Sequence, residues 1–208
     1  MLVLCCTDAL AQSVQSIYSP VILVRDRTSE RTSPDARPIQ MREDGADFAR
    51  IASLGDDLSR TGGTGSRYMP DRRDLNRAFP GSTKGSNTGL VASIVYQALT
   101  TYCGAVIDLH TGSFDRANLP QVRVDLGNQR AVDLARRFGA AVVLGGAGPR
   151  GSLRREVMEP GIPAIIYEAG LPLRFEPEEI RAGVQGVRNV MIALGMRTGT
   201  ATPSTPTA

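Results

Sequence analysis

From residue 87 to residue 196, short apolar runs alternate with segments of helical periodicity. The runs at 105–109, 140–144 and 162–167 are too short for helices and are mainly aliphatic, which is typical of strands buried on both faces. A sheet of such strands needs helices on both faces to cover it. The pattern therefore predicts an α/β fold of three layers, with a mixed, mostly parallel sheet between two layers of helices.

The ends of the expected helices carry recognisable signals. Asn87 and Asn128 are suited to cap the helices that follow them, because their side chains can accept hydrogen bonds from free backbone amides. Gly139 lies where a glycine ends the second helix, and Pro177 suits the first turn of a third. These signals predict three helices that begin near these caps.

Three strand predictions differ in where they place the strand. Residues 20–24 are short and β-branched, which is typical of a strand. Residues 121–126 follow Pro120, which favours the rim of the sheet because proline cannot donate to a ladder. The run at 140–144 is apolar throughout, so we expect it to be buried.

The chain divides into three parts by the texture of its sequence. Residues 1–66 are poorly patterned, and 25–47 hold too few large apolar side chains to offset the entropy of ordering, so we expect partial disorder there. Residues 67–196 form the regularly patterned domain. The tail at 197–208 is mostly Thr, Pro and Ala, and we expect it to be disordered.

The composition argues against two kinds of partner. Aromatic residues make up 5% of the chain, tryptophan is absent, and the formal charge of +3 comes without a dense run of Lys or Arg. We therefore expect no binding of nucleic acid. No apolar run reaches the ~20 residues that span a bilayer, so we expect no membrane partner.

The cysteines indicate the compartment. Cys5, Cys6 and Cys103 are odd in number, and adjacent cysteines are poor partners for each other. We therefore expect no disulfide framework and a cytoplasmic protein. Residues 1–11 lack a basic start and are interrupted by Asp8, so we do not interpret them as a signal peptide.

His110 is the sole histidine of the sequence and directly follows the strand expected at 105–109. The two-residue period of a strand puts Asp108 on the same side. A lone histidine is more often structural than functional. Its place at the carboxyl end of a strand, where sites of α/β sheets lie, instead favours a metal ligand, with Asp108 as a supporting carboxylate or a buried acid satisfied by backbone donors.

Glu168 directly follows the strand expected at 162–167, and the small residues Ala169 and Gly170 come after it. A carboxylate in such a place is partly removed from water, which suits a general base. The alternative is an ordinary salt bridge at the end of a strand. His110 and Glu168 both follow strands, so we expect them to lie at the same edge of the sheet.

Basic and amide side chains gather before these strands. Arg67, Asn76 and Arg77 stand in a segment that also holds Arg72 and Arg73. Arginine binds carboxylates through two parallel hydrogen bonds, and asparagine adds a neutral donor. The segment therefore suggests a substrate with a free carboxylate, and the alternative is an ordinary charged loop.

Taken together, five segments resemble the succinylglutamate desuccinylase/aspartoacylase family, whose catalytic domain is similar to zinc carboxypeptidases. The segments occur in the order of the family, and the resemblance covers residues 67–196. They are Arg67–Ser82, Ile107–Ser113, Arg116–Arg123, Gly151–Arg154 and Gly161–Gly170.

The resemblance implies hydrolysis of the amide or ester bond of an acyl amino acid by water that zinc (Zn²⁺) activates. It also implies roles for six residues. These are His110 as a zinc ligand, Glu168 as the group that takes a proton from water and gives it to the leaving amine, Arg67 at the developing oxyanion, Asn76 and Arg77 at a substrate carboxylate, and Arg154 in the pocket.

The sequence departs from the family in its metal ligands. The first two zinc ligands of the family come from a Gly-x-His-Gly-x-Glu segment that this sequence does not contain. A catalytic zinc ion needs three protein ligands, so we expect impaired activity. We also expect that residues 1–66 reflect a fragment, a misassigned start or a frameshift, which a reading of the upstream DNA in all three frames would test.

Two other functions stay open. One is a non-catalytic module that binds carboxylates through Arg67, Asn76 and Arg77. The other is a peptidase of the zinc carboxypeptidase type, which uses the same residue roles. Zinc content distinguishes the module from the enzyme, and activity on peptides distinguishes the peptidase from the deacylase.

Overall fold

The computed structural model describes residues 2–5, 21–23, 68–113, 116–172, 174 and 176–204, and of the first two ranges it describes only the backbone. Predictions for Arg67, for residues 24–66 and for the last four residues lie outside this part. The described strands are β1 (Leu2–Cys5), β2 (Val21–Leu23), β3 (Val106–His110), β4 (Asn118–Val124), β5 (Val143–Gly145) and β6 (Ala164–Gly170). The described helices are the 3₁₀ turn η1 (Leu75–Arg77), α2 (Asn87–Tyr102), α3 (Gln129–Phe138), α4 (Leu153–Met158) and α5 (Pro177–Ala193).

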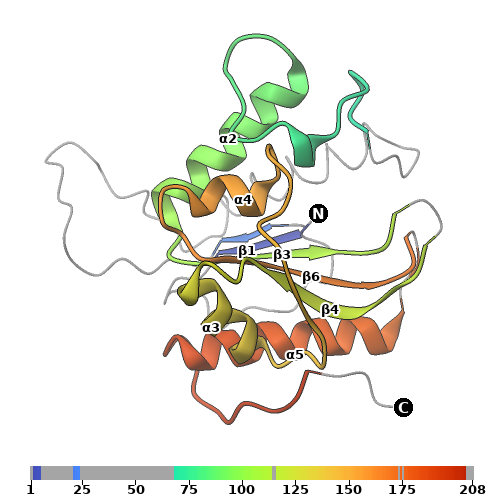
Figure 1. The fold of residues 1–208 in the computed structure, drawn as a ribbon, viewed down its shortest axis with the longest axis vertical. Helices are drawn as coiled ribbons and strands as arrows, with labels where there is room; N and C mark the ends of the chain where they lie inside the picture. Colours follow the sequence, from blue (N-terminus) through green and yellow to red (C-terminus); the bar gives the residue numbers. More distant parts are fainter. Residues whose placement is uncertain are drawn as a thin grey trace, which may run out of the picture.

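In the described part of the chain, the strands form one mixed sheet in the order β2-β1-β3-β6-β4-β5. The pairs β1–β2, β3–β6 and β4–β5 are parallel, whereas β1–β3 and β4–β6 are antiparallel. Helices cover both faces, with α2 and α4 on one side and α3 and α5 on the other (Figure 1). The predicted fold class, a three-layer α/β fold with a mixed, mostly parallel sheet, is confirmed.

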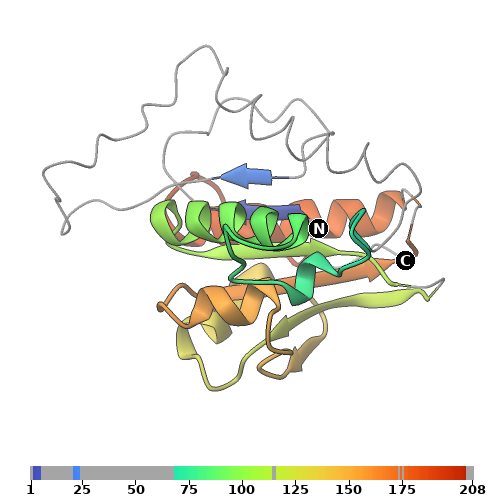
Figure 2. The same ribbon diagram turned by 90° about the horizontal axis from the view of Figure 1, so that it is seen from above.

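Alternate residues of the central strands pack into two separate apolar clusters. Val106 and Ala164 join side chains of α2 and α4. Ile107 and Ile165, one position further along each strand, join side chains of α3 and α5. Figure 2 views the sheet from the side that α2 and α4 cover. This alternation assigns every second residue of β3 and β6 to the α2/α4 face.

The predicted helices agree with the structure, with one shift at a cap. Asn128 accepts a hydrogen bond from the Ala131 amide at 3.1 Å, and Gly139 ends α3 with a φ of 83°. Pro177 occupies the first turn of α5. The cap of α2 is Ser86 and not Asn87, which is the first helical residue. The short helix α4 had no counterpart in the prediction, since six residues show too little periodicity.

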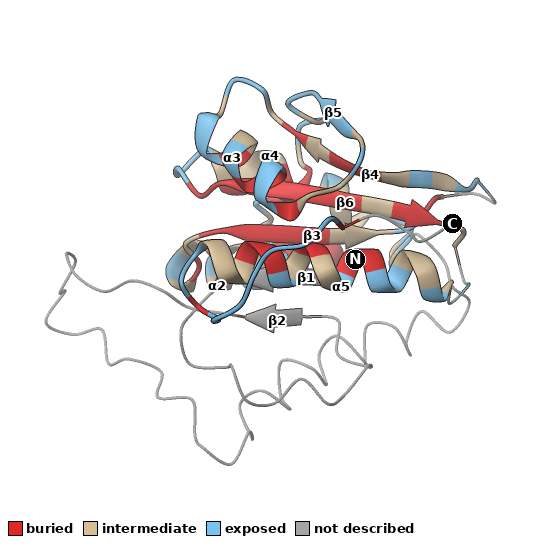
Figure 3. Ribbon diagram, turned by 90° about the horizontal axis from the view of Figure 1, so that it is seen from below, coloured by how far each residue is buried: buried red, intermediate tan, exposed pale blue. Residues whose placement is uncertain are grey.

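Two strand predictions are wrong in placement. β4 lies between β6 and β5 and not at the rim, because a shift in register between Asn118 and Gln121 accommodates Pro120 within the strand. The run expected at 140–144 as a buried strand forms β5 three residues later, and all of β5 is exposed (Figure 3). β5 is an edge strand, so among the described residues it pairs with β4 on one side only, and its apolar side chains are exposed. The predicted strand at 20–24 is present as β2.

The described end of the tail differs from the expected disorder. Asn189 of α5 donates from Nδ2 to the Thr202 carbonyl at 2.6 Å and accepts from the Thr202 amide at 3.1 Å. The Ser204 amide donates to the Gly139 carbonyl at 3.0 Å, and Ser204 is buried. Specific polar contacts therefore hold Thr202 and Ser204 against α3 and α5 where composition alone predicted no structure.

Cys103, directly after α2, is disulfide-bonded, and its partner lies outside the side chains that the structure describes. The sequence predicted no disulfide framework, and it gave no indication of this single bond. The pairing of β1 with β3 puts Cys5 opposite Val106, which brings the backbone of the N-terminal strand close to Cys103. None of the described helices is long and apolar enough to cross a membrane.

Candidate active site

His110 and Glu168 lie side by side at the carboxyl ends of β3 and β6. The parallel register pairs His110 directly with Glu168, and the same register pairs Asp108 with Ile166. Both His110 and Glu168 are an even number of residues from Val106 and Ala164, so they lie on the α2/α4 face. The expectation that these two residues meet at one edge of the sheet agrees with this register.

Asp108 and His110 form a close but poorly aligned pair. The His110 Nε2 atom lies 2.8 Å from Asp108 Oδ2, as the shared face predicts. Asp108 is completely buried and His110 is 22% exposed. Neither Asp108 oxygen, nor Nε2 of His110, makes a hydrogen bond of normal geometry with the described residues. A buried carboxylate without hydrogen bonds is costly, so these atoms are suited to bind a cation or another donor.

Two side chains of β4 hold the carboxylate of Glu168. Asn118 Nδ2 lies 2.6 Å from Glu168 Oε2, and Arg123 Nη2 lies 3.1 Å from the same oxygen. The Glu168 side chain is 15% exposed, so it keeps access to a substrate. Sequence reasoning included Asn118 and Arg123 in a family segment but gave them no role, because the pairing of β4 with β6 was not predicted.

Arg154 of α4 brings a buried positive charge to the same face. The residue is 4% exposed, and its Nη2 donates to the Gly146 carbonyl at 2.8 Å. Its Nε and Nη1 atoms have no hydrogen-bond partner among the described residues. Burial lowers the pKa of Arg154, and the negative charges of Asp125, Asp108 and Glu168 partly oppose that effect. The guanidinium is therefore a buried cation that these three carboxylates partly offset.

Asn76 and Arg77 make contacts that do not involve His110 or Glu168. Asn76 Oδ1 accepts a hydrogen bond from the Leu153 amide at 2.8 Å, which satisfies a free amide at the start of α4. Arg77 is exposed and lines an open cavity of about 610 Å³ together with Arg73 and Lys84. Neither His110 nor Glu168 lines that cavity. The predicted carboxylate contacts of Asn76 and Arg77 therefore stay predictions, as does the role of Arg67, which lies outside the described residues.

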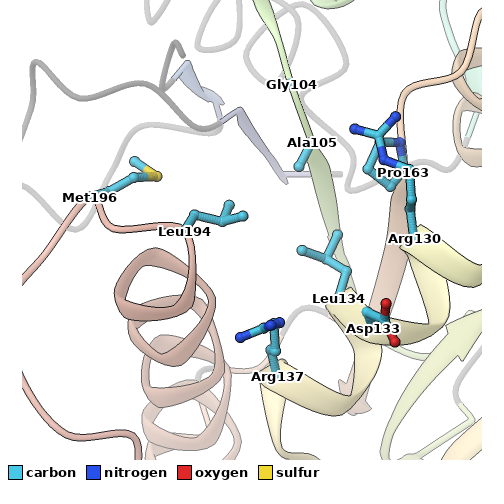
Figure 4. A pocket seen from close by; sticks show the side chains of 9 residues that line it. All are labelled: Gly104, Ala105, Arg130, Asp133, Leu134, Arg137, Pro163, Leu194 and Met196. Carbon is cyan, nitrogen blue, oxygen red and sulfur yellow. The ribbon is translucent and has the colours of Figure 1, made fainter. Parts of the chain in front are cut away.

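A second cavity, of about 320 Å³, lies at the other end of the strands. Ala105 just before β3, Pro163 just before β6 and Leu134 of α3 line it, together with Arg130 and Arg137 (Figure 4). It therefore opens at the amino ends of β3 and β6, away from His110 and Glu168. We conclude that this cavity is not the site of the predicted chemistry.

The described residues do not by themselves fit a catalytic zinc ion. Among them, no group of three or more His, Cys, Asp or Glu side chains is arranged to hold a metal ion. His110 and the unpaired carboxylate of Asp108 supply fewer than the three protein ligands that such a site uses. What the described residues place on this face is a partly exposed carboxylate at Glu168 and a buried guanidinium at Arg154.

Comparison with known proteins shows similarity to deacylating enzymes. N-alpha-acetyl-L-2,4-diaminobutyric acid deacetylase of Halomonas elongata is 29% identical over 143 residues, which cover 65% of this chain and 42% of that enzyme. A solved succinylglutamate desuccinylase/aspartoacylase from Rhodobacter sphaeroides has 26% identity and a TM-score of 0.57, with 65% of this chain and 42% of that chain covered. The product-bound ectoine utilization protein of Ruegeria pomeroyi has 26% identity and a TM-score of 0.61, with 68% and 45% covered.

The chain thus spans less than half the length of these relatives. Residues 63–194 match the succinylglutamate desuccinylase/aspartoacylase catalytic domain, and the match covers more than half of the chain. It includes the strands β3, β4 and β6 that carry His110, Asn118 and Glu168. On this evidence the chain belongs to the succinylglutamate desuccinylase/aspartoacylase family.

Proposed function

We propose that this chain carries the substrate-binding and proton-transfer part of a zinc-dependent hydrolase site that cleaves the amide or ester bond of an N-acyl amino acid. The observation that carries the proposal is the pairing of His110 with Glu168 on the face that also holds the buried Arg154. The relatives support the substrate class, since one deacetylates N-alpha-acetyl-L-2,4-diaminobutyric acid. The partner is then a small acyl amino acid with a free carboxylate.

Each residue has a distinct task in this proposal. Glu168 takes a proton from the attacking water and gives it to the leaving amine, which makes it base and then acid. Arg154 lines the pocket and supplies a buried positive charge there, with Asn76 and Arg77 as the donors that bind the substrate carboxylate. Arg67 stabilises the developing oxyanion, a contact whose loss in comparable sites costs on the order of 10²–10³ in rate.

The set of zinc ligands is incomplete among the described residues. Family resemblance implies zinc, with His110 as one ligand. Because the described residues do not supply three ligands, we propose that this chain binds zinc weakly and hydrolyses its substrate slowly. Equilibrium dialysis against zinc, with the bound metal measured by mass spectrometry, tests this directly. Replacing His110 with Ala should remove most of the bound zinc.

Turnover tests the function itself. Purified chain with added zinc is incubated with N-acetyl-2,4-diaminobutyrate, N-succinylglutamate and N-acetylaspartate, and the released acyl acid is measured. Hydrolysis of one of these, and none of peptides with a free C-terminus, supports the deacylase. Hydrolysis of the peptides alone would favour the carboxypeptidase-type alternative, and hydrolysis of neither set would overturn an active hydrolase.

A non-catalytic module is the second candidate, and the incomplete set of metal ligands favours it. It predicts binding of acyl amino acids without zinc and without turnover, which calorimetry would detect. The cytoplasmic location expected from the odd cysteine count stays a prediction, and the disulfide of Cys103 weighs against it.

A further inference from the structure

Among the described residues, the two donors to Glu168 contact the same carboxylate oxygen. The Asn118 amide nitrogen lies 2.6 Å from Oε2, and the Arg123 guanidinium nitrogen lies 3.1 Å from it. No described residue donates to the other oxygen, Oε1. The carboxylate is thus held on one side and open on the other.

A bulge in β4 brings Asn118 to this position. The antiparallel register pairs Gln121 with Glu168 and Asn118 with Gly170, so three residues of β4 span the length of two residues of β6. In a regular strand, residues three apart point to opposite faces. The extra residue, next to Pro120, turns Asn118 to the same face as Gln121, and therefore to the face of Glu168.

Arg123 reaches Glu168 by the ordinary geometry of the sheet. It lies two residues beyond Gln121, so it shares the face of Glu168 and is its diagonal neighbour. The Arg123 side chain is 42% exposed, whereas that of Glu168 is 15% exposed. The charge of Arg123 therefore reaches from the rim of the site to a carboxylate that lies deeper.

We propose that Asn118 and Arg123 are positioning residues, which fix the Glu168 carboxylate so that Oε1 is the atom that exchanges protons with water and the leaving group. This inference rests on the proposed function of Glu168. A hydrogen bond from Asn118 and an ion pair with Arg123, both to one oxygen, restrict rotation of the carboxylate. A general base must hold its proton-accepting atom within a fraction of an ångström of the productive place, so loss of this restraint slows the reaction.

The first experiment measures the chemical reactivity of the Glu168 carboxylate and does not depend on hydrolysis of a substrate. The folded protein is treated with a water-soluble carbodiimide and an amine, and labelling of each carboxylate is measured by peptide mass spectrometry. Asn118→Leu and Arg123→Met keep the shape of the side chain but remove the donor. Each should raise labelling of Glu168 about tenfold, the effect of losing one hydrogen bond or close ion pair to a charged group.

Two controls separate positioning from loss of structure. Leu119, next to Asn118 in β4, is 69% exposed, so Leu119→Ala should leave labelling of Glu168 unchanged. Glu179 of α5 has a buried oxygen with no hydrogen-bond partner among the described residues. Its labelling should not change in any variant, and a rise there together with Glu168 would show that the fold has loosened.

The second experiment uses turnover of the N-acyl amino acid by the zinc-supplemented chain. Asn118→Leu and Arg123→Met should lower kcat about 10- to 100-fold with little change in KM, because the restraint acts on the base and not on substrate binding. Arg123→Lys keeps the charge and should recover most of kcat.

Labelling of Glu168 and turnover together distinguish failure of this inference from failure of the proposed function. Labelling of Glu168 that stays at the wild-type level in both variants overturns the positioning role, whatever the turnover. Increased labelling with wild-type kcat overturns it as well. Increased labelling in a chain that hydrolyses no substrate supports the positioning contacts and overturns the proposed hydrolase.

Discussion

Arg154 and Asp108 are buried charges whose hydrogen bonds are incomplete within the described residues. Burying such groups costs free energy of folding, and removing one of two neighbouring buried charges usually destabilises a protein, because the other charge is left uncompensated. Active sites commonly carry this cost because a ligand completes the pairing. Replacing one of these residues can therefore show whether they form a binding site or a structural ion-pair network. The two cases differ in how binding and stability change.

Replacing Arg154 with Met tests this at a single residue. The variant keeps an unbranched side chain but loses the charge, so binding of an N-acyl amino acid should weaken about 10- to 100-fold, the range for hydrogen bonds to a charged group. The Tm should fall by roughly 5–15 °C, because the buried carboxylate of Asp108 loses a nearby positive charge. Calorimetric titration and thermal unfolding measure the two quantities. Unchanged affinity with a much lower Tm would show that Arg154 is structural.

A pH dependence is expected at Asp71. Its carboxylate accepts hydrogen bonds from the hydroxyl and, at 2.9 Å, from the amide of Thr88 at the start of α2. The Thr88 hydroxyl is the main cause that lowers the pKa of Asp71. An acid whose pKa is lowered on folding contributes stability above its unfolded pKa, near 4, and loses it as the pH falls below that value.

The matched variant is Asp71→Asn, which keeps the shape of the side chain. Its Tm should lie below that of wild type at pH 7, and the gap should narrow as the pH is lowered from about 4. Thermal unfolding of both proteins at several pH values between pH 3 and pH 7 measures this difference in Tm. A gap that is the same at every pH would mean that the charge of Asp71 does not contribute.

The residues of the site could be predicted to different degrees. The contact between His110 and Asp108 follows from the two-residue period of one strand, so sequence alone predicts it correctly. Asn118 and Arg123 reach Glu168 through the antiparallel pairing of β4 with β6 and through a bulge. Pairing direction and bulges depend on contacts between distant segments, which leave no local signal in the sequence.

At the scale of elements, α5 packs closely on α3 through a glycine. A Cβ atom on Gly186 would lie 2.1 Å from Cε1 of Phe138, whose ring stacks on that of Tyr167 with centroids 5.1 Å apart. The ring is part of the buried cluster and has little room to move. The close approach of the two helices therefore depends on the absence of a side chain at residue 186.

Gly186→Ala should destabilise the protein by about 1–3 kcal/mol, the usual cost of overpacking. In a domain of this size that lowers the Tm by roughly 2–10 °C. Gly89→Ala in α2 is the matched control, because its Cβ would approach Ser86 Oγ at 3.2 Å and no other atom within 3.4 Å. Equal Tm values for the two variants would contradict the packing described here.

The elements themselves were predictable where periodicity is long. Asn128, Gly139 and Pro177 mark the ends of α3 and α5 as expected, because caps act through the nearest backbone amides and carbonyls. The apolar run that forms β5 gives no indication that the strand lies at an exposed edge. Position in a sheet is a property of the whole fold, so an apolar strand alone does not determine it.

At the scale of the whole molecule, the tail joins two elements that are distant in sequence. Asn189 of α5 donates to both the Phe138 carbonyl of α3 and the Thr202 carbonyl of the tail. Deleting residues 197–208 would leave a buried amide with fewer partners, at a cost of about 1–3 kcal/mol. The Tm should therefore fall by roughly 2–10 °C in thermal unfolding. An unchanged Tm would support the disorder that the composition suggests.

The same scale bears on function, since the chain spans less than half the length of the relatives described above and holds His110 as its sole histidine. The account nevertheless assigns a working base to Glu168. Release of the acyl acid from N-acetyl-2,4-diaminobutyrate by the zinc-supplemented chain, compared with Glu168→Gln, tests that assignment most directly. The account predicts slow, zinc-dependent release that falls about 10²- to 10⁴-fold in the variant. Equal release by both proteins, or none by the wild-type chain, would contradict it.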